Sequence, residues 1–269
     1  MSRLLLRQQL PALLLAGTLL AAMLPNARLS ARSEPAPPAD LSAAAIIERL
    51  SEHNRRRNQL LASYQVARHY DLKNELYGKE VVMEVEVGYR APDKLSFEIR
   101  RRVGSSFLAG RVFGRMMEGE RKSLQAENRR RSAMTAENYE FQLAGTETIL
   151  GRPAYRLKVV PRRKDTFLFT GRIWVDAEDF ALVRAEGQPA KRPSFWTRKI
   201  DFVRTYKKVG PFWLPQRTEV VVEVFLFGTS WVNIENNDYR VRLNPAAAVT
   251  AKQPQKFFLR PSEGCARIG

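Results

Sequence analysis

The sequence predicts a mainly β (α+β) protein: a strongly curved antiparallel half-barrel of roughly ten strands, with helices plugging its concave face. Runs in which apolar and polar residues alternate recur from Ser63 to Leu243, and this is the period of a strand with one buried face. Only two regions have helical spacing, too few to cover both faces of so long a sheet. Such a sheet must curl, so we expect its apolar face to form a concave interior.

The first forty residues predict an export signal followed by a linker. Arg3 and Arg7 precede an uncharged apolar run, and small residues then lead to residue 31, so a signal peptide is predicted over 1–31. The apolar run is short for a membrane span, and an uncleaved N-terminal anchor is the alternative interpretation. Residues 32–40 are rich in Pro and Ala and are predicted to be an extended linker.

Helical and strand periods then alternate along the chain. Apolar spacing predicts a first helix from Asp40, as its N-cap, to Leu61. Period-two runs next predict an antiparallel meander with strands at 64–70, 81–87 and 95–99. One long or broken helix is predicted over 107–134, which lacks Pro and is rich in Arg, Glu, Met and Ala.

Strand periodicity resumes at Asn138 and continues almost without interruption. The predicted strands lie at 139–149, 155–161, 167–175, 182–186, 199–207, 218–227 and 230–243. The main domain is therefore predicted to span 41–243, and 244–269 is predicted to form a loose C-terminal tail.

Residue sets typical of catalysis or metal binding are sparse. Neither His53 nor His69 has a metal-ligand partner at useful spacing, and the chain contains no Gly-x-Ser-x-Gly motif or phosphate loop. Cys265 is the single cysteine and falls in the predicted tail, so no intramolecular disulfide is expected. We therefore predict no enzyme activity, no catalytic residues, no metal site and no cofactor.

One acidic cluster, Asp176, Glu178 and Asp179, lies between two predicted strands. Its oxygens could bind a hard cation, but the spacing does not match an EF-hand loop. The prediction is a solvated hairpin turn, with Trp174 exposed on the same strand face as Asp176.

The chain is strongly basic, with a formal net charge of +17. Loss of the three arginines in the predicted signal lowers +17 to +14. Basic runs recur at 55–57, 100–102, 129–131 and 162–164. Because the chain is predicted to be exported, we expect anionic lipid headgroups or an acidic protein partner, not nucleic acid. Ordinary solvated faces are the alternative.

The stretch SSFLAGRVFGRMM, residues 105–117, is predicted to form a loosely held cover over an apolar cavity. Its apolar residues follow one helical stripe and its flank: Leu108, Val112, Phe113, Met116 and Met117. Gly110 and Gly114 weaken the helix by about 1 kcal/mol each relative to Ala. A core-packing helix, or a helix whose charged face lies on a membrane, is the alternative.

Three segments follow one another after Asn138: NYEFQLAGTETILGRPAYRLKVVPRR, GRIWVDAEDFALVRAEG and KIDFVRTYKKVGPFWLPQRTEVVVEV, in which VGPFWLP is taken as a turn. Their order resembles bacterial envelope proteins of the LolA/LolB-like lipoprotein-carrier superfamily, often labelled outer-membrane lipoprotein-sorting proteins. The resemblance implies a periplasmic half-barrel whose apolar cavity holds acyl chains without covalent chemistry. A non-transporting envelope interaction protein or signalling regulator is the alternative, because a fold does not determine a role.

The hypothesis is therefore a periplasmic carrier that binds lipid or lipoprotein acyl chains. The residues predicted to line its cavity share an apolar side chain on an inward strand face or on the cover. From the first half of the chain they are Tyr64, Val66, Val81, Met83, Val85, Phe97, Ile99, Phe107, Leu108, Val112, Phe113, Met116 and Met117. From the later strands they are Leu157, Phe169, Ile173, Val175, Val222 and Val224.

Overall fold

The computed structural model of the chain describes residues 41–192, 195, 197–226 and 228–245. The predicted signal at 1–31, the linker at 32–40 and nearly all of the predicted tail, with Cys265, lie outside the described residues. The side chains of Phe107, Leu108 and Arg111 also lie outside the described part of the structure. The predicted domain boundaries therefore stay predictions.

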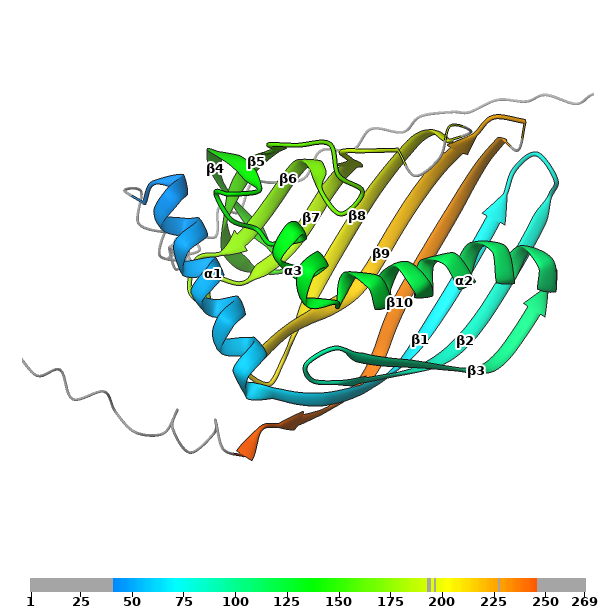
Figure 1. Cartoon of the computed structure of the whole chain (residues 1–269), viewed down its shortest axis with the longest axis horizontal. Coiled ribbons are helices and arrows are strands. Elements are labelled where there is room, and N and C mark those ends of the chain that lie inside the picture. The colour runs from blue at the N-terminus through cyan, green and yellow to red at the C-terminus, as the bar shows by residue number, and fades with distance from the viewer. Residues whose placement is uncertain (1–40, 193–194, 196, 227, 246–269) are drawn as a thin grey trace, which may run out of the picture. The chain divides into compact units, whose positions relative to one another are not determined.

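The described residues form one antiparallel sheet of ten strands, in the order β3-β2-β1-β10-β9-β8-β7-β6-β5-β4 (Figure 1). The strands are β1 (Leu61–Asn74), β2 (Lys79–Arg90), β3 (Lys94–Gly104), β4 (Tyr139–Ile149), β5 (Arg152–Pro161), β6 (Phe169–Asp176), β7 (Leu182–Pro189), β8 (Thr197–Val209), β9 (Phe212–Val224) and β10 (Gly228–Leu243). Because β3 and β4 are edge strands, the sheet stays open. The predicted fold class, a mainly β open half-barrel, is confirmed.

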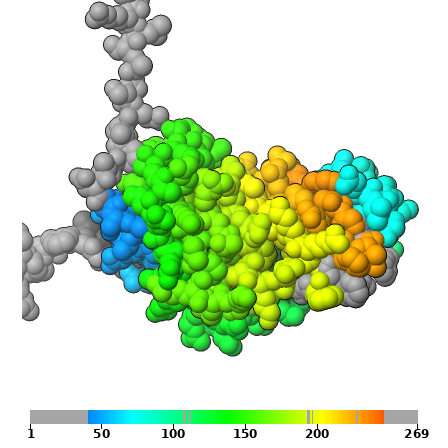
Figure 2. Space-filling model, turned by 90° about the horizontal axis from the view of Figure 1, so that it is seen from above, coloured from blue at the N-terminus to red at the C-terminus, as the bar shows by residue number. Residues whose placement is uncertain are grey.

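The pairing of β1 with β10 joins segments that are far apart in the sequence. The ladder runs from Leu61 opposite Leu243 to Asn74 opposite Ser230, with two register shifts on the way. At the far end the β1–β2 and β9–β10 hairpins touch, and the Tyr77 hydroxyl donates to the Leu226 carbonyl at 3.3 Å. Figure 2 shows these two hairpins, cyan and orange, side by side.

Three helices accompany the sheet in the described residues: α1 (Ala43–Leu60), α2 (Ser106–Ser123) and α3 (Ala126–Ser132). The helix predicted over 107–134 is therefore broken, between α2 and α3. The predicted N-cap of the first helix was wrong, since the hydroxyl of Ser42, not Asp40, caps α1 by accepting the Ala45 N–H at 3.2 Å. Its predicted last residue, Leu61, is extended and begins β1. None of these described helices combines the length and the apolar character that a membrane crossing needs.

The segment VGPFWLP, predicted as a turn, is mostly strand. The turn is confined to Gly210 and Pro211, and β9 begins at Phe212. Phe212 and Leu214 are buried on one face and Trp213 on the other, so both faces of this strand end are covered. Pro215 lies at a register shift between β8 and β9, a position where a strand tolerates proline.

Trp174 of β6 is buried, at 4% exposure, so its predicted exposure was wrong. It packs with Ala154, Val183 and Trp213 in a small cluster on the convex face of the sheet. Its indole N–H donates to Glu147 Oε2 at 2.7 Å, which satisfies the one polar atom of the ring. A sheet face that looked solvated from the sequence therefore carries its own local core.

The acidic cluster lies at the hairpin turn predicted between β6 and β7, but its predicted solvation was wrong for Asp176, since only Glu178 of the three is well exposed, at 66%. Asp176 is 1% exposed and accepts two hydrogen bonds from Arg152, at 2.6 Å from Nε and 2.9 Å from Nη2. Its Oδ1 also accepts the backbone N–H groups of Glu178 and Asp179, at 3.1 and 2.8 Å. Asp176 therefore closes the hairpin and anchors it to β5.

Asp179 connects the β6–β7 turn to the β8–β9 hairpin. Its carboxylate accepts from Lys208 Nζ at 2.6 Å and from the Trp213 indole at 2.8 Å. Burial opposes the charge of Asp179, but the hydrogen bonds from Lys208 and Trp213 outweigh it, so the pKa of Asp179 is lowered. No group of three or more His, Cys, Asp and Glu within the described ranges is placed to hold a metal ion.

We expect Asp176→Ala to destabilise the protein by about 2–4 kcal/mol, because it removes the buried acceptor of Arg152 and of the Glu178 and Asp179 backbone N–H groups. Glu178→Ala is the matched control, since Glu178 contacts the same guanidinium at 2.8 Å but is 66% exposed. Its loss is expected to change the free energy of unfolding by less than about 1 kcal/mol. Urea unfolding of both variants measures this, and equal effects would contradict a structural role for Asp176.

Candidate functional site

The concave face of the sheet carries two apolar clusters. Figure 1 shows α1 and α2 lying over different ends of this face. In the α1 cluster, α1 contributes Ile46, Ile47 and Leu50, the loop before β6 contributes Leu168, and the strands contribute Tyr139, Tyr155, Leu157, Val159, Ile173, Val175 and Ala185. In the α2 cluster, α2 contributes Ala109, Phe113 and Met117, and the strands contribute Val66, Tyr70, Leu72, Val81, Met83, Val85, Val87, Val232 and Ile234. Each helix therefore covers one end of the same face.

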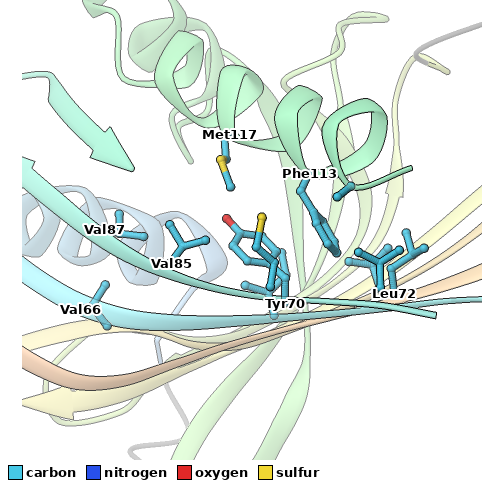
Figure 3. Close-up of a cluster of buried hydrophobic side chains, with 12 residues drawn as sticks. Val66, Tyr70, Leu72, Val85, Val87, Phe113 and Met117 are labelled. Atoms are coloured by element: carbon cyan, nitrogen blue, oxygen red, sulfur yellow. The ribbon is translucent and has the colours of Figure 1, made fainter. Parts of the chain in front are cut away.

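The α2 cluster is a helix lying on an apolar floor. Figure 3 shows Phe113 and Met117 pointing from α2 towards the strands that carry Tyr70, Leu72 and Val85. The ring centroids of Phe113 and Tyr70 lie 4.9 Å apart, so the two rings are in contact. Both rings are almost fully buried, so α2 fills this end of the concave face in the described state.

The residues predicted to line one cavity divide between the two clusters. The α2 cluster and its half-buried margin hold Tyr64, Val66, Val81, Met83, Val85, Phe97, Val112, Phe113, Met116 and Met117. The α1 cluster and its margin hold Leu157, Phe169, Ile173 and Val175. Ile99 is 52% exposed on the edge strand β3, and the side chains of Phe107 and Leu108 lie outside the described part. For all the residues predicted to line the cavity, the role as ligand contacts stays a prediction.

Between the two clusters runs a central strip of half-buried apolar residues on β8 and β9: Ile200, Phe202, Val220, Val222 and Val224. The register places Ile200 opposite Val222 and Phe202 opposite Val220. Phe202 packs against the α1 cluster and Val220 against the α2 cluster, so the strip joins the two. The concave face is therefore one continuous apolar surface with a partly open centre.

A buried ion pair holds α2 to the sheet. Arg68 of β1 is 6% exposed, and its Nη1 donates to Glu120 Oε2 of α2 at 2.6 Å. Its remaining N–H groups reach Glu120 Oε1 at 3.2 Å, the Tyr70 hydroxyl at 3.1 Å and Asn236 Oδ1 at 2.7 Å. Among the described residues, Arg68 therefore has one carboxylate partner, Glu120 of α2, and is otherwise a charge on an apolar floor.

This pair shapes the ionisation of its neighbours. Burial opposes the charge of Arg68, but the charge and hydrogen bonds of Glu120 outweigh it, so the pKa of Arg68 is raised. Burial, reinforced by the negative charge of Glu120, raises the pKa of Tyr64 to about 12. The floor under α2 therefore holds the Arg68–Glu120 ion pair and neutral phenols at ordinary pH.

Sequence reasoning missed Arg68, although a signal was present. Arg68 has the same strand parity as Val66 and Tyr70, so a cation falls on a face predicted to be buried. A buried cation needs a carboxylate partner, but the sequence does not show that the partner is Glu120, which is far along the chain.

Three glycines lie on the outer face of α2, at Gly110, Gly114 and Gly119. A Cβ added at any of them would meet no atom within 4 Å, so packing does not require glycine there. Each glycine lowers helix stability by about 1 kcal/mol relative to Ala. By contrast, α1 contains no glycine. The cover at the α2 end is therefore intrinsically the weaker helix.

One family model and several solved structures are similar to the chain. Residues 132–235 match the model of a Family of unknown function (DUF5686). No curated protein matches the chain. A LolA superfamily protein from Nitrosomonas europaea is similar at 14% identity and a TM-score of 0.35, over 77% of this chain and 96% of that one.

Two further solved structures are similar. A putative outer membrane lipoprotein-sorting protein domain from Vibrio parahaemolyticus has 15% identity and a TM-score of 0.38, over 73% of this chain and 92% of that one. A DUF1329 family protein from Desulfovibrio piger has 13% identity and a TM-score of 0.39, over 75% of this chain and 94% of that one. The resemblance predicted from the sequence is confirmed to the extent that such proteins are among its structural neighbours.

We expect Glu120→Ala to lower the free energy of unfolding by about 2–3 kcal/mol, because it leaves the buried charge of Arg68 without its carboxylate partner. The expected loss is below that of a fully buried pair, since Glu120 is 35% exposed. Replacing both partners, in Arg68→Met/Glu120→Leu, should restore most of the stability.

The matched control is Glu118→Ala on the same helix, because Glu118 pairs only loosely with Arg121 and Lys122, at 3.9 and 3.7 Å. Urea unfolding should show a change below about 0.5 kcal/mol for this control. A Glu120→Ala variant as stable as the control would show that the pair does not hold α2.

Proposed function

We propose that the protein is a periplasmic carrier that holds the acyl chains of a lipid or lipoprotein on its concave apolar face, without covalent chemistry. One observation carries this proposal: α2 covers a large apolar floor while its own sequence keeps it a weak helix. A cover that only had to fill a core would not need three glycines at positions free of packing constraints.

An acyl chain would find a continuous path if α2 moved away. The floor under α2 includes Tyr70, Leu72, Met83 and Val85, all almost fully buried now. The central strip then continues this apolar surface towards the α1 cluster. A long, flexible, apolar ligand fits such a path better than a compact polar one.

Simple energetics favour long chains over short ones. Uncovering Phe113 and Met117 costs about 5 kcal/mol of apolar burial. An acyl chain taking their place gains about 0.8 kcal/mol per methylene, so about six buried methylenes offset that cost. We therefore infer that the ligand carries at least one chain of fatty-acid length.

Polar groups on the floor under α2 would meet the other end of the ligand. When α2 moves, Glu120 leaves with it and Arg68 remains on the floor with Tyr70 and Asn236. A negatively charged headgroup would replace the lost carboxylate and keep the cation paired. This favours an anionic amphiphile as the carried ligand.

Stabilising α2 should weaken uptake. We expect Gly110→Ala/Gly114→Ala to stabilise the helix by about 2 kcal/mol and to lower the apparent affinity for a fluorescent long-chain fatty acid by about thirtyfold. The reason is that each Ala stabilises the closed cover, which must loosen before the floor is exposed. Fluorescence titration of the purified protein measures the effect.

The control is Asn58→Ala, an exposed position on α1, which stabilises a helix at the other end of the face and should leave the affinity within about twofold. Loss of affinity equal in both variants would contradict α2 as the moving cover. Wild-type protein that takes up no fatty acid, and that retains a stable protein partner through purification, would favour the non-transporting interaction protein instead.

A further inference from the structure

A hollow of about 590 Å³ lies at one end of β1, β2, β3 and β10. We call it the basic groove, and it is lined by Ser63, Tyr64, Gln65, Gly88, Tyr89, Arg90, Lys94, Leu95, Ser96, Arg240, Val241 and Arg242. Four of these side chains are cations and none is a carboxylate. It belongs to the convex face, because Ser63 and Gln65 have the strand parity opposite to Tyr64 and Val66.

The strand register builds the groove from two rows of neighbours. In the first row, Arg242 lies opposite Ser63, Ser63 opposite Arg90, and Arg90 opposite Lys94. In the second row, Arg240 lies opposite Gln65, Gln65 opposite Gly88, and Gly88 opposite Ser96. Cations thus stand on both sides of a floor of small and neutral polar residues.

Gly88 has no side chain, which leaves space at the floor of the groove. A Cβ at this position would lie 2.7 Å from the Ser96 hydroxyl, which itself donates to the Gly88 carbonyl at 3.3 Å. The walls on β10 and β2 are two strands apart, about 10 Å at the ordinary strand spacing. This width admits a single tetrahedral oxyanion with its hydrogen-bond partners.

The four cations of the groove differ from most of the basic residues around them. Further along the same strands, Arg100 and Arg101 of β3 pair with Glu86 and Glu84 of β2. Within the described residues, Arg90, Lys94, Arg240 and Arg242 have no carboxylate within ion-pair distance, although Asp93 is in the loop between Arg90 and Lys94. Like charges gathered without counter-charges are unfavourable unless an external anion neutralises them.

We propose that the basic groove binds a phosphate ester group. The guanidinium group of arginine can donate two parallel hydrogen bonds to the oxygens of a phosphate. The four positive charges of the groove exceed the single negative charge of a carboxylate, so they favour the more highly charged phosphate group. Ser63 adds a hydroxyl donor at the floor. The site lies on the face opposite the acyl-binding surface, so this inference goes beyond the carrier proposal and does not depend on it.

The test compares Arg90→Gln/Arg242→Gln, one cation from each wall, with Arg101→Gln/Arg217→Gln, which removes the same charge from paired arginines on the same sheet. The probes are inorganic phosphate, followed by NMR shifts, and vesicles of phosphatidylglycerol with phosphatidylcholine, followed by co-sedimentation. Vesicles of phosphatidylcholine alone are the uncharged reference. We expect the groove variant to lose about thirtyfold in affinity and the control no more than about threefold.

The two probes distinguish the sources of the phosphate. A loss seen on phosphatidylglycerol vesicles alone assigns the group to a lipid headgroup, and a loss seen on inorganic phosphate alone assigns it to a soluble ester. Equal weakening in the groove and control variants would overturn the proposal, as would wild-type protein that binds neither probe. Polyglutamate bound more tightly than either phosphate probe, and lost in the groove variant, would assign the groove to an acidic peptide instead.

Discussion

An open sheet with one apolar face must hide that face from water, and the described part of this chain has only two helices long enough to do so. Ten strands present more apolar surface than α1 and α2 together cover, because each helix reaches one end of the sheet. The central strip on β8 and β9 therefore stays half-buried. Nearly everything we infer about function follows from this shortage of cover.

The two covers are built differently. α1 has no glycine and buries three large aliphatic side chains. α2 carries glycines on its outer face and is fastened by a charge pair as well as by apolar contacts. A buried ion pair adds little net stability compared with an apolar pair of the same size, and here it joins Glu120 of α2 to Arg68 of β1. The α2 end is thus well defined in position and modest in stability, which suits a cover that opens and returns.

Periodicity was enough to predict the sheet. The strand predicted at 139–149 coincides with β4, because its first half alternates clearly and the strand ends at the Leu150–Gly151 turn. Periodicity failed where both faces of a strand are covered, as at Phe212, Trp213 and Leu214, since a continuous apolar run gives no alternation. It also failed at Asp176, whose partner Arg152 lies on the neighbouring strand and is invisible in a local pattern.

The sequence was enough to predict which residues of the candidate site face inward, but not how they are grouped under the helices. Inward-facing residues such as Met83 and Ile173 were identified by strand parity, but parity does not tell which helix covers which strand. The division into an α1 cluster and an α2 cluster depends on the order of strands in the sheet, where β1 pairs with β10. The basic groove was hidden for the same reason, because Arg90 and Arg242 meet only through that pairing.

Hydrogen–deuterium exchange on the ligand-free protein tests the central claim, that α2 is a weakly held cover, most directly. The account predicts that the backbone amides of α2 exchange faster than those of α1 and faster than those of β1 and β2 beneath it, although Phe113 and Met117 are buried. Protection of α2 equal to that of α1 would contradict it, because the helix would then be a permanent part of the core.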